Sequence, residues 1–226
     1  SFGTAVDFDA SGTTPQIAIT FDSNSNKVVI AYIDNGDGKK GKAIVGTVSG
    51  TGISFGTAAV FDSGNVENSQ PELAFDSSNN KVVIAYRDDA NSNYGTAIVG
   101  TVSGTDISFG TAVVFESAFA QYIAVAFDSS ANKTVIAYNT PSDSNKGKLA
   151  IGTVSSTSIS FADLVTFDAT GIYQVAATFD PSTNKVVIAY YFGSGSVYPL
   201  YSIVLQNTAT TLTSENFIGF ANAAYA

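Results

Sequence analysis

A twelve-residue segment occurs four times along this chain at almost constant spacing. The first copy, FDSNSNKVVIAY, begins at Phe21, and the others begin at Phe75, Phe127 and Phe179, at intervals of 54, 52 and 52 residues. Two shorter motifs, SFGTA and AIVGTVSG, recur in step with it. Because helical solenoids use shorter units with helical periodicity, a period near fifty residues indicates a repeated unit of several β-strands.

The first complete unit divides into four segments with the character of β-strands. They span residues 16–21, 27–33, about 42–49 and 53–61. The second segment is apolar along almost its whole length, as expected for a strand covered on both faces. Sixteen Phe and eleven Tyr among many Val, Ile and Thr also favour sheet. The sequence therefore predicts an all-β fold, namely a β-propeller of four blades with four antiparallel strands each and a period of about 52–54 residues.

The two ends of the chain predict how such a ring closes. Residues 1–8 repeat the fourth strand of a unit without the first three, whereas the last unit has three strands and lacks the fourth. We therefore expect the N-terminal strand to complete the last blade, which would remove two open sheet edges. A slice of a ring of five to eight blades is the alternative. Residues 1–206 form the predicted propeller domain, and residues 207–226, outside the repeat, form a connector or interaction segment.

The composition excludes several classes of function. The net charge is −9 and the ten basic residues are scattered, so we expect no nucleic-acid partner. We also expect no membrane insertion, since no apolar run approaches eighteen residues. Histidine and cysteine are both absent, which removes the commonest general base and all thiolate metal ligands.

The acidic residues are better explained as parts of turns than as chemical groups. Asp22 and its three counterparts begin Asp-Ser/Pro-x-x-Asn turns, in which a carboxylate caps backbone N–H groups. Residues 34–38 resemble half of a calcium loop, but Lys39 and Lys40 follow and would repel the ion. A glycosidase needs two facing carboxylates, and the first strands offer Glu72 alone. We therefore expect no metal, no cofactor and no enzymatic activity.

Loops that differ between units point to a binding face. The loops that join the second strand to the third, and the fourth to the next unit, vary, whereas the other turns are nearly constant. The two sets would lie on opposite faces of a propeller, and variable loops on a rigid scaffold are where recognition usually occurs. Aromatic rings beside polar groups suit stacking on sugars or anchoring a protein contact. The alternative is simple drift of solvent-exposed loops.

The candidate binding residues on the variable face are Tyr122, Tyr173, Arg87, Asp88, Tyr94, Asp34, Phe192 and Tyr198. Tyr122 and Tyr173 are the strongest candidates. Tyr122 stands where the other three units have Gln, and Tyr173 stands one position earlier in its unit. Both are expected to enter a first strand near the propeller axis, where a ligand would be enclosed.

Two resemblances follow from these motifs. The segment FDPSTNK at residues 179–185 is similar to the turns of kelch-type propellers, although the paired glycines of kelch blades are missing. The array of NKVVIAY, AIVGTVSGT and ISFGTA resembles repeats in tail-fibre and other virion-surface proteins of marine bacteriophages. Residues 212–219 resemble the connector that follows such arrays. This second resemblance covers essentially the whole chain and implies a structural or adhesive role.

The expected function is therefore that of a non-catalytic propeller in a phage tail fibre or surface decoration. Its partner would be a host glycan or a neighbouring virion protein. The alternative is a secreted or cell-surface bacterial carbohydrate-binding propeller module. Both place the protein at a virion surface or in an extracellular setting, and self-association into a homo-oligomer stays open.

Overall fold

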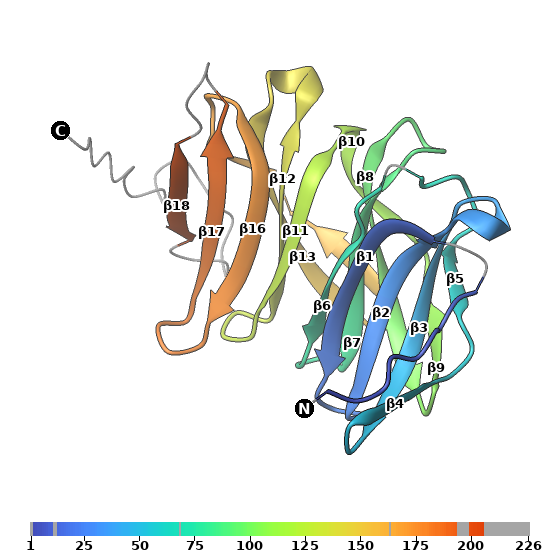
Figure 1. The fold of residues 1–226 in the computed structure, drawn as a ribbon. Helices are drawn as coiled ribbons and strands as arrows, with labels where there is room; N and C mark the ends of the chain where they lie inside the picture. Colours follow the sequence, from blue (N-terminus) through green and yellow to red (C-terminus); the bar gives the residue numbers. More distant parts are fainter. Residues whose placement is uncertain (1, 11–12, 68, 163, 194–198, 206–226) are drawn as a thin grey trace.

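The structure of the protein is a computed structural model, which describes residues 2–10, 13–67, 69–162, 164–193 and 199–205 (Figure 1). These residues form an all-β structure of four antiparallel sheets, one for each repeat. The first strands of successive sheets contact one another in order, β1 with β6, β6 with β11 and β11 with β16. The predicted repeat of antiparallel sheets is thus confirmed.

The first sheet comprises β1 (Thr13–Asp22), β2 (Lys27–Asp34), β3 (Lys40–Ser49), β4 (Gly52–Phe55) and β5 (Ala59–Asp62), with a 3₁₀ turn, η1 (Asn35–Asp37), between β2 and β3. Its order is β1-β2-β3-β4, and β5 also pairs with β3. The predicted fourth strand is therefore broken in two, β4 on one half of β3 and β5 on the other. The break falls at Gly56, whose N–H donates to the carbonyl oxygen of Val45 at 2.9 Å.

The other sheets follow the same plan. The second comprises β6 (Glu72–Asp76), β7 (Lys81–Asp88), β8 (Tyr94–Ser103), β9 (Asp106–Phe109) and β10 (Val113–Phe119). The third comprises β11 (Gln121–Asp128), β12 (Lys133–Thr140), the 3₁₀ turn η2 (Pro141–Asp143), β13 (Lys146–Ser155), β14 (Ser158–Phe161) and β15 (Val165–Asp168). The fourth comprises β16 (Ile172–Asp180), β17 (Lys185–Phe192) and β18 (Leu200–Leu205).

The repeated Asp turns have the predicted local structure. The Asp22 carboxylate accepts hydrogen bonds from the backbone N–H groups of Asn24 and Ser25 at 2.9 and 3.0 Å. Asn26 closes the turn in the left-handed conformation, with φ of 54°, which Asn tolerates better than most residues. The interpretation of these aspartates as turn caps is confirmed.

The hydrophobic core lies between the sheets. Side chains alternate across each strand, so every sheet has a front face, turned toward the following sheet, and a back face, turned toward the preceding one. Val29 and Ala31 on the front face of the first sheet share a cluster with Val82 and Ile84 on the back face of the second. Two further clusters join the second sheet to the third and the third to the fourth.

The ends of the array differ from the expected closed ring. Among the described residues, no hydrophobic cluster joins the fourth sheet to the first. The N-terminal segment forms no strand over residues 2–10, and in the described part of the chain β18 pairs with β17 alone. Instead, Phe8 packs on the back face of the first sheet, with its ring centroid 5.4 Å from Tyr32 and 5.3 Å from Phe55. The predicted segment 207–226 lies outside the described residues.

Candidate binding pocket

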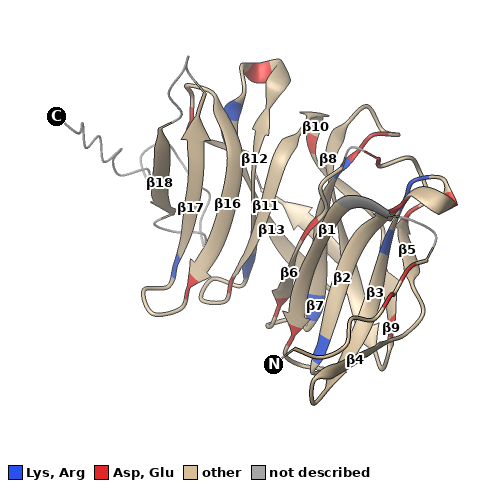
Figure 2. Cartoon of the chain, in the orientation of Figure 1, with Lys and Arg blue, Asp and Glu red and all other residues tan. Residues whose placement is uncertain are grey.

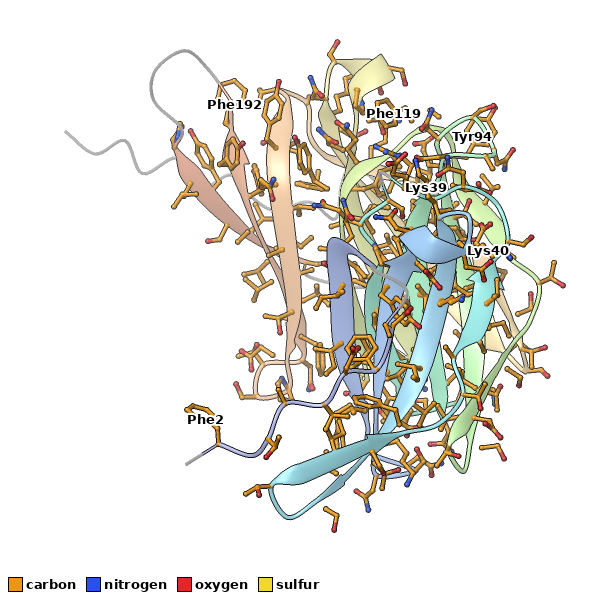
Figure 3. The ribbon with its side chains drawn as sticks, turned by 45° about the vertical axis from the view of Figure 1, so that its right-hand side comes forward. Phe2, Lys39, Lys40, Tyr94, Phe119 and Phe192 are labelled. Carbon is orange, nitrogen blue, oxygen red and sulfur yellow. The ribbon has the colours of Figure 1, made fainter. Side chains whose placement is uncertain are left out.

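The constant turns and the variable loops lie at opposite ends of the sheets. In Figure 1 the turns between first and second strands lie at the lower ends of the sheets, whereas η1 and η2 lie at the upper ends of theirs. We call the upper end the loop end. Phe192, Phe119 and Tyr94 lie near this end, and Phe2 projects near the other (Figure 3). The predicted separation of the two sets of loops is therefore confirmed.

A pocket of about 190 Å³ opens at the first strands of the first three sheets. It is lined by Gln16, Gln70, Arg87, Ala120, Gln121, Tyr122 and Ile123. Three of these residues, Gln16, Gln70 and Tyr122, occupy the same position of the repeat in three successive units. The contacts between β1, β6 and β11 bring this position together. Of the predicted binding residues, Tyr122 and Arg87 line the pocket.

Tyr122 has an unusual backbone conformation. Its φ is 50°, in the left-handed region that bulky residues rarely adopt. The cause is an irregularity in the pairing of β11 with β12, where the register shifts between Gln121 and Ala124. Gln174, at the matching position of the fourth unit, has a φ of 43°. Such strained residues persist only where the surroundings hold them, and they cluster at binding sites.

Tyr122 also begins a row of three tyrosines. Its ring centroid lies 6.2 Å from that of Tyr173 in an edge-to-face arrangement, and Tyr173 stacks on Tyr191 at 5.8 Å. The Nδ2 group of Asn145 donates to the Tyr173 hydroxyl at 3.4 Å. The structure thus brings together the two strongest candidates from the sequence, at the junction of the third and fourth sheets.

Arg87 is held firmly at the wall of the pocket. Its Nε donates to Asp89 Oδ1 at 2.6 Å, and its guanidinium carbon lies 4.9 Å from the centroid of the Phe119 ring. Its backbone N–H donates to the Ser69 hydroxyl at 3.0 Å. An arginine fixed in this way is preorganised, so less side-chain entropy is lost when it binds a ligand.

Gln16 contributes an acceptor that has no partner among the described residues. Its Oε1 atom is buried and makes no hydrogen bond to any residue that the structure describes. A buried polar atom without a partner costs free energy, which a hydrogen bond from a ligand hydroxyl would recover. Gln16 and Gln70 were not among the candidates predicted from the sequence, although the recurrence of Gln at this position could have indicated them.

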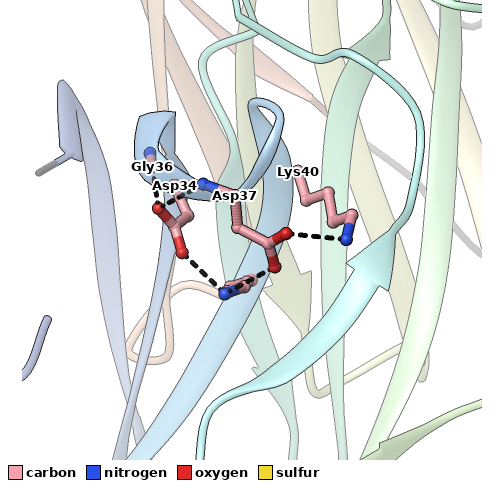
Figure 4. Close-up of polar contacts among 5 residues, drawn as sticks. Asp34, Gly36, Asp37 and Lys40 are labelled. Atoms are coloured by element: carbon pink, nitrogen blue, oxygen red, sulfur yellow. Dashed lines mark hydrogen bonds and ion pairs between the residues drawn. The ribbon is translucent and has the colours of Figure 1, made fainter. Parts of the chain in front are cut away.

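Other predicted residues lie outside the pocket lining. Asp34 caps η1 by accepting from the N–H groups of Gly36 and Asp37, at 2.9 and 3.1 Å, and it also accepts from Lys42 Nζ at 2.6 Å (Figure 4). This hydrogen bond raises the pKa of Lys42. Asp37 forms ion pairs with Lys40 and Lys42 at 2.8 and 2.9 Å, so lysines already neutralise both carboxylates of this loop.

The remaining candidates are distributed around the loop end. Asp88 accepts from the N–H of Asn91 at 3.0 Å, and burial raises its pKa. Tyr94 pairs with Phe119 across β8 and β10, next to Arg87. Phe192 ends β17, opposite Ile172. Tyr198 lies outside the described residues.

A second repeated interaction was not foreseen from the sequence. The Tyr138 hydroxyl donates to Glu116 Oε2 at 3.2 Å, and the Tyr190 hydroxyl donates to Asp168 Oδ2 at 2.9 Å. In each case the acidic residue comes from the preceding sheet, 22 residues before the tyrosine. Burial, with the nearby carboxylate, raises the pKa of both tyrosines, so both stay protonated. These contacts tie neighbouring sheets together.

In the described parts of the chain, no three His, Cys, Asp or Glu residues are grouped so that they could hold a metal ion. No helix within the same residues has the length and apolar character needed to cross a membrane.

Comparisons with known proteins add one structural likeness. A scan against protein-family models finds no match, and a search of curated proteins also finds none. Among solved structures, a triple arginine-to-alanine mutant of AofleA from Arthrobotrys oligospora is similar over 84% of this chain and 68% of its own. The TM-score is 0.42 and the sequence identity 9%, a level of similarity that carries no argument about function.

Proposed function

We propose that the four sheets are blades of a β-propeller and that the protein is a non-catalytic recognition module that binds a glycan at its loop end. The observation that carries this proposal is the convergence of Gln16, Gln70 and Tyr122, from three successive sheets, on one pocket beside Arg87. The resemblance of the repeats to tail-fibre proteins favours a virion surface as its setting. A secreted or cell-surface bacterial module would use the same pocket.

The chemistry of the pocket suits a sugar. Amide side chains both donate and accept, as a ring of hydroxyl groups requires, and a tyrosine ring can cover the apolar face of a pyranose. A volume of about 190 Å³ is smaller than the roughly 300–1,000 Å³ of pockets for drug-sized ligands. The proposed ligand is therefore one sugar residue of a longer glycan.

The lining also supports a binding role rather than hydrolysis. None of the residues that line the pocket carries a carboxylate, whereas glycoside hydrolysis ordinarily needs two. Glu72 lies on the neighbouring strand β6, and burial raises its pKa. It does not line the pocket, and the lining residues offer no carboxylate to act with it.

The proposal is tested by a glycan array with the intact protein, followed by titration calorimetry with the best sugar. Tyr122→Gln is the sharpest variant, because Gln174 holds the same left-handed backbone in the fourth unit and glutamine is therefore tolerated. Loss of the ring should cost about 1–3 kcal/mol, roughly a 5- to 150-fold loss of affinity. Gln16→Leu should also weaken binding, since it removes the unpaired acceptor.

Phe192→Ala is the matched control, because this aromatic residue lies at the same end but does not line the pocket. Unchanged affinity in Tyr122→Gln and Gln16→Leu, or a larger loss in Phe192→Ala, would place the site elsewhere. An array without any retained sugar would reject the glycan proposal. Detection of the protein in purified virions would separate the viral setting from the bacterial one.

A further inference from the structure

The back face of the first sheet is covered by Phe8 at Tyr32 but is exposed along β1 and at the end of β3, where the other sheets are covered. Ile19 is 63% exposed, whereas its counterpart in the second sheet, Leu73, is 7% exposed. Val48 is 58% exposed, and its counterpart in the third sheet, Val154, is 6% exposed. The charged residues of β1 and β2 lie near the ends of these strands (Figure 2). Such an apolar patch is typical of an interaction surface.

The front face of the fourth sheet is also exposed where the front faces of the other sheets are buried. Val204 on β18 is 48% exposed, whereas Val45, at the matching position of β3, is fully buried. Ala189 on β17 is exposed, although its counterparts in the other sheets, Ala31 and Ala85 among them, are fully buried. Each internal interface joins one front face to one back face. The two exposed faces are therefore the two halves of a fourth interface of the same kind.

The N-terminal segment occupies a defined place in that interface. Phe8 packs on Tyr32 of the first sheet as Phe61, from the first sheet, packs on Tyr86 of the second, with centroid distances of 5.4 and 5.1 Å. A Cβ atom at Gly3 would collide with the carbonyl oxygen of Thr51. Gly56 and Gly110, the corresponding glycines of the next two units, approach the carbonyl oxygens of Thr105 and Thr157 in the same way. Residues 2–9 thus lie where the outer strand of a preceding sheet would lie.

Residues 2–9 match a fourth strand of the repeat, and a fourth strand pairs with a third strand such as β18. In the first and third sheets the third strand pairs with both parts of the fourth. β18 pairs with β17 only, so within the described residues its other edge is unpaired, as strand addition requires. The N-terminal segment packs on the first sheet and β18 belongs to the fourth, so three sheet interfaces lie between them in one chain.

We propose that a second copy of this chain packs head to tail on the first. The front face of one fourth sheet would cover the back face of the other first sheet, and residues 2–9 of one copy would pair with β18 of the other. Two copies would bring eight sheets together, the upper end of the usual range for propellers, in place of the four-blade ring expected from the sequence. This inference rests on the blade arrangement proposed above but not on glycan binding, and association is measured separately.

The mass of the protein in solution is the first test. Light scattering after gel filtration should give twice the chain mass of 23.3 kDa. Ile19→Lys and Val204→Lys should each give monomers that stay folded by circular dichroism, because both side chains are exposed in the single chain. Val114→Lys is the matched control, since this exposed valine lies on the second sheet, which packs against the first sheet and the third. A monomer at all concentrations, or assemblies that grow without limit, would overturn the proposal.

Cysteine cross-linking tests the strand pairing directly, because the chain has no cysteine of its own. In the first sheet Ala43 pairs with Ala59, and the repeat makes Ser202 and Val6 their counterparts. Oxidised Val6→Cys/Ser202→Cys protein should run as a covalent dimer on a non-reducing gel, whereas each single variant should not. A cross-link within one chain would show closure without a partner and overturn the proposal, as would a dimer that forms no cross-link.

Discussion

Substituting Gly110 with alanine tests the close approach between sheets. A Cβ atom added there would lie 2.9 Å from the carbonyl carbon of Thr157, in the next sheet, and still closer to its oxygen. Because the obstacle is backbone rather than a flexible side chain, the two sheets must shift apart. Overpacking of this kind typically costs about 1–3 kcal/mol. For a domain of this size that corresponds to a melting temperature lower by about 2–12 °C.

Gly52→Ala is the matched control for this experiment. A Cβ at Gly52 would have the Ser49 carbonyl oxygen at an ordinary 3.5 Å. Both substitutions restrict the unfolded chain, which alone stabilises a protein by about 0.4–1 kcal/mol, so the difference between them isolates the steric effect. Thermal unfolding of both variants at one protein concentration, followed by circular dichroism, measures it. If Gly110→Ala melts at the same temperature as Gly52→Ala, the hairpin does not approach the glycine as described.

Two further predictions concern carboxylates. Burial raises the pKa of Glu72 above its ordinary value of 4.5. The folded state therefore binds the proton more tightly than the unfolded state, and stability is lost as the pH rises from 4.5 through the raised pKa. Glu72→Gln should melt at a higher temperature than the parent at pH 7, and this difference should vanish below the ordinary pKa. Hydrogen bonds from Ser182 and then Thr183 lower the pKa of Asp180 to about 2, a stabilisation present above the ordinary value of 3.8 and lost as the pH falls through about 2. Ser182→Ala should raise the pKa measured by carbon NMR toward 3.8, and an unchanged titration would contradict the assignment to the serine hydroxyl.

Local features of the fold could be predicted from the sequence because their causes are local. The second strand was expected at residues 27–33 and is β2, Lys27–Asp34. The apolar run and the flanking Asp-x-x-x-Asn turn determine it within a dozen residues. The fourth strand was expected to be continuous and is broken at Gly56, where the backbone approaches Thr105 of the next sheet so closely that a Cβ atom would collide with its carbonyl oxygen. The residues around Gly56 do not indicate that Thr105 will lie beside it, because Thr105 belongs to another sheet.

The candidate pocket was predictable only in part for the same reason. The comparison of repeats singled out Tyr122, because it replaces glutamine at a recurring position. It did not show that Gln16 and Gln70 line the same pocket, since this depends on how β1, β6 and β11 pack side by side. Arg87 was selected for its loop, whereas its contact with Phe119, from another strand, is a property of the fold.

The contacts of Tyr32 indicate that the stability of this array is local. Tyr32 has the same surroundings as the buried tyrosines of the other sheets: a phenylalanine ring, here Phe8, and an acidic residue, here Asp9. Burial and the hydrogen bond to Asp9 raise its pKa, as burial and Asp168 do for Tyr190. Asp168 is supplied by a complete sheet, whereas Asp9 comes from a segment that forms no strand. The contact with Tyr32 therefore needs only Phe8 and Asp9, and not a complete preceding sheet. Stability then follows from each sheet and its immediate junctions, as in other repeat proteins, and the second copy proposed above would use the same contacts.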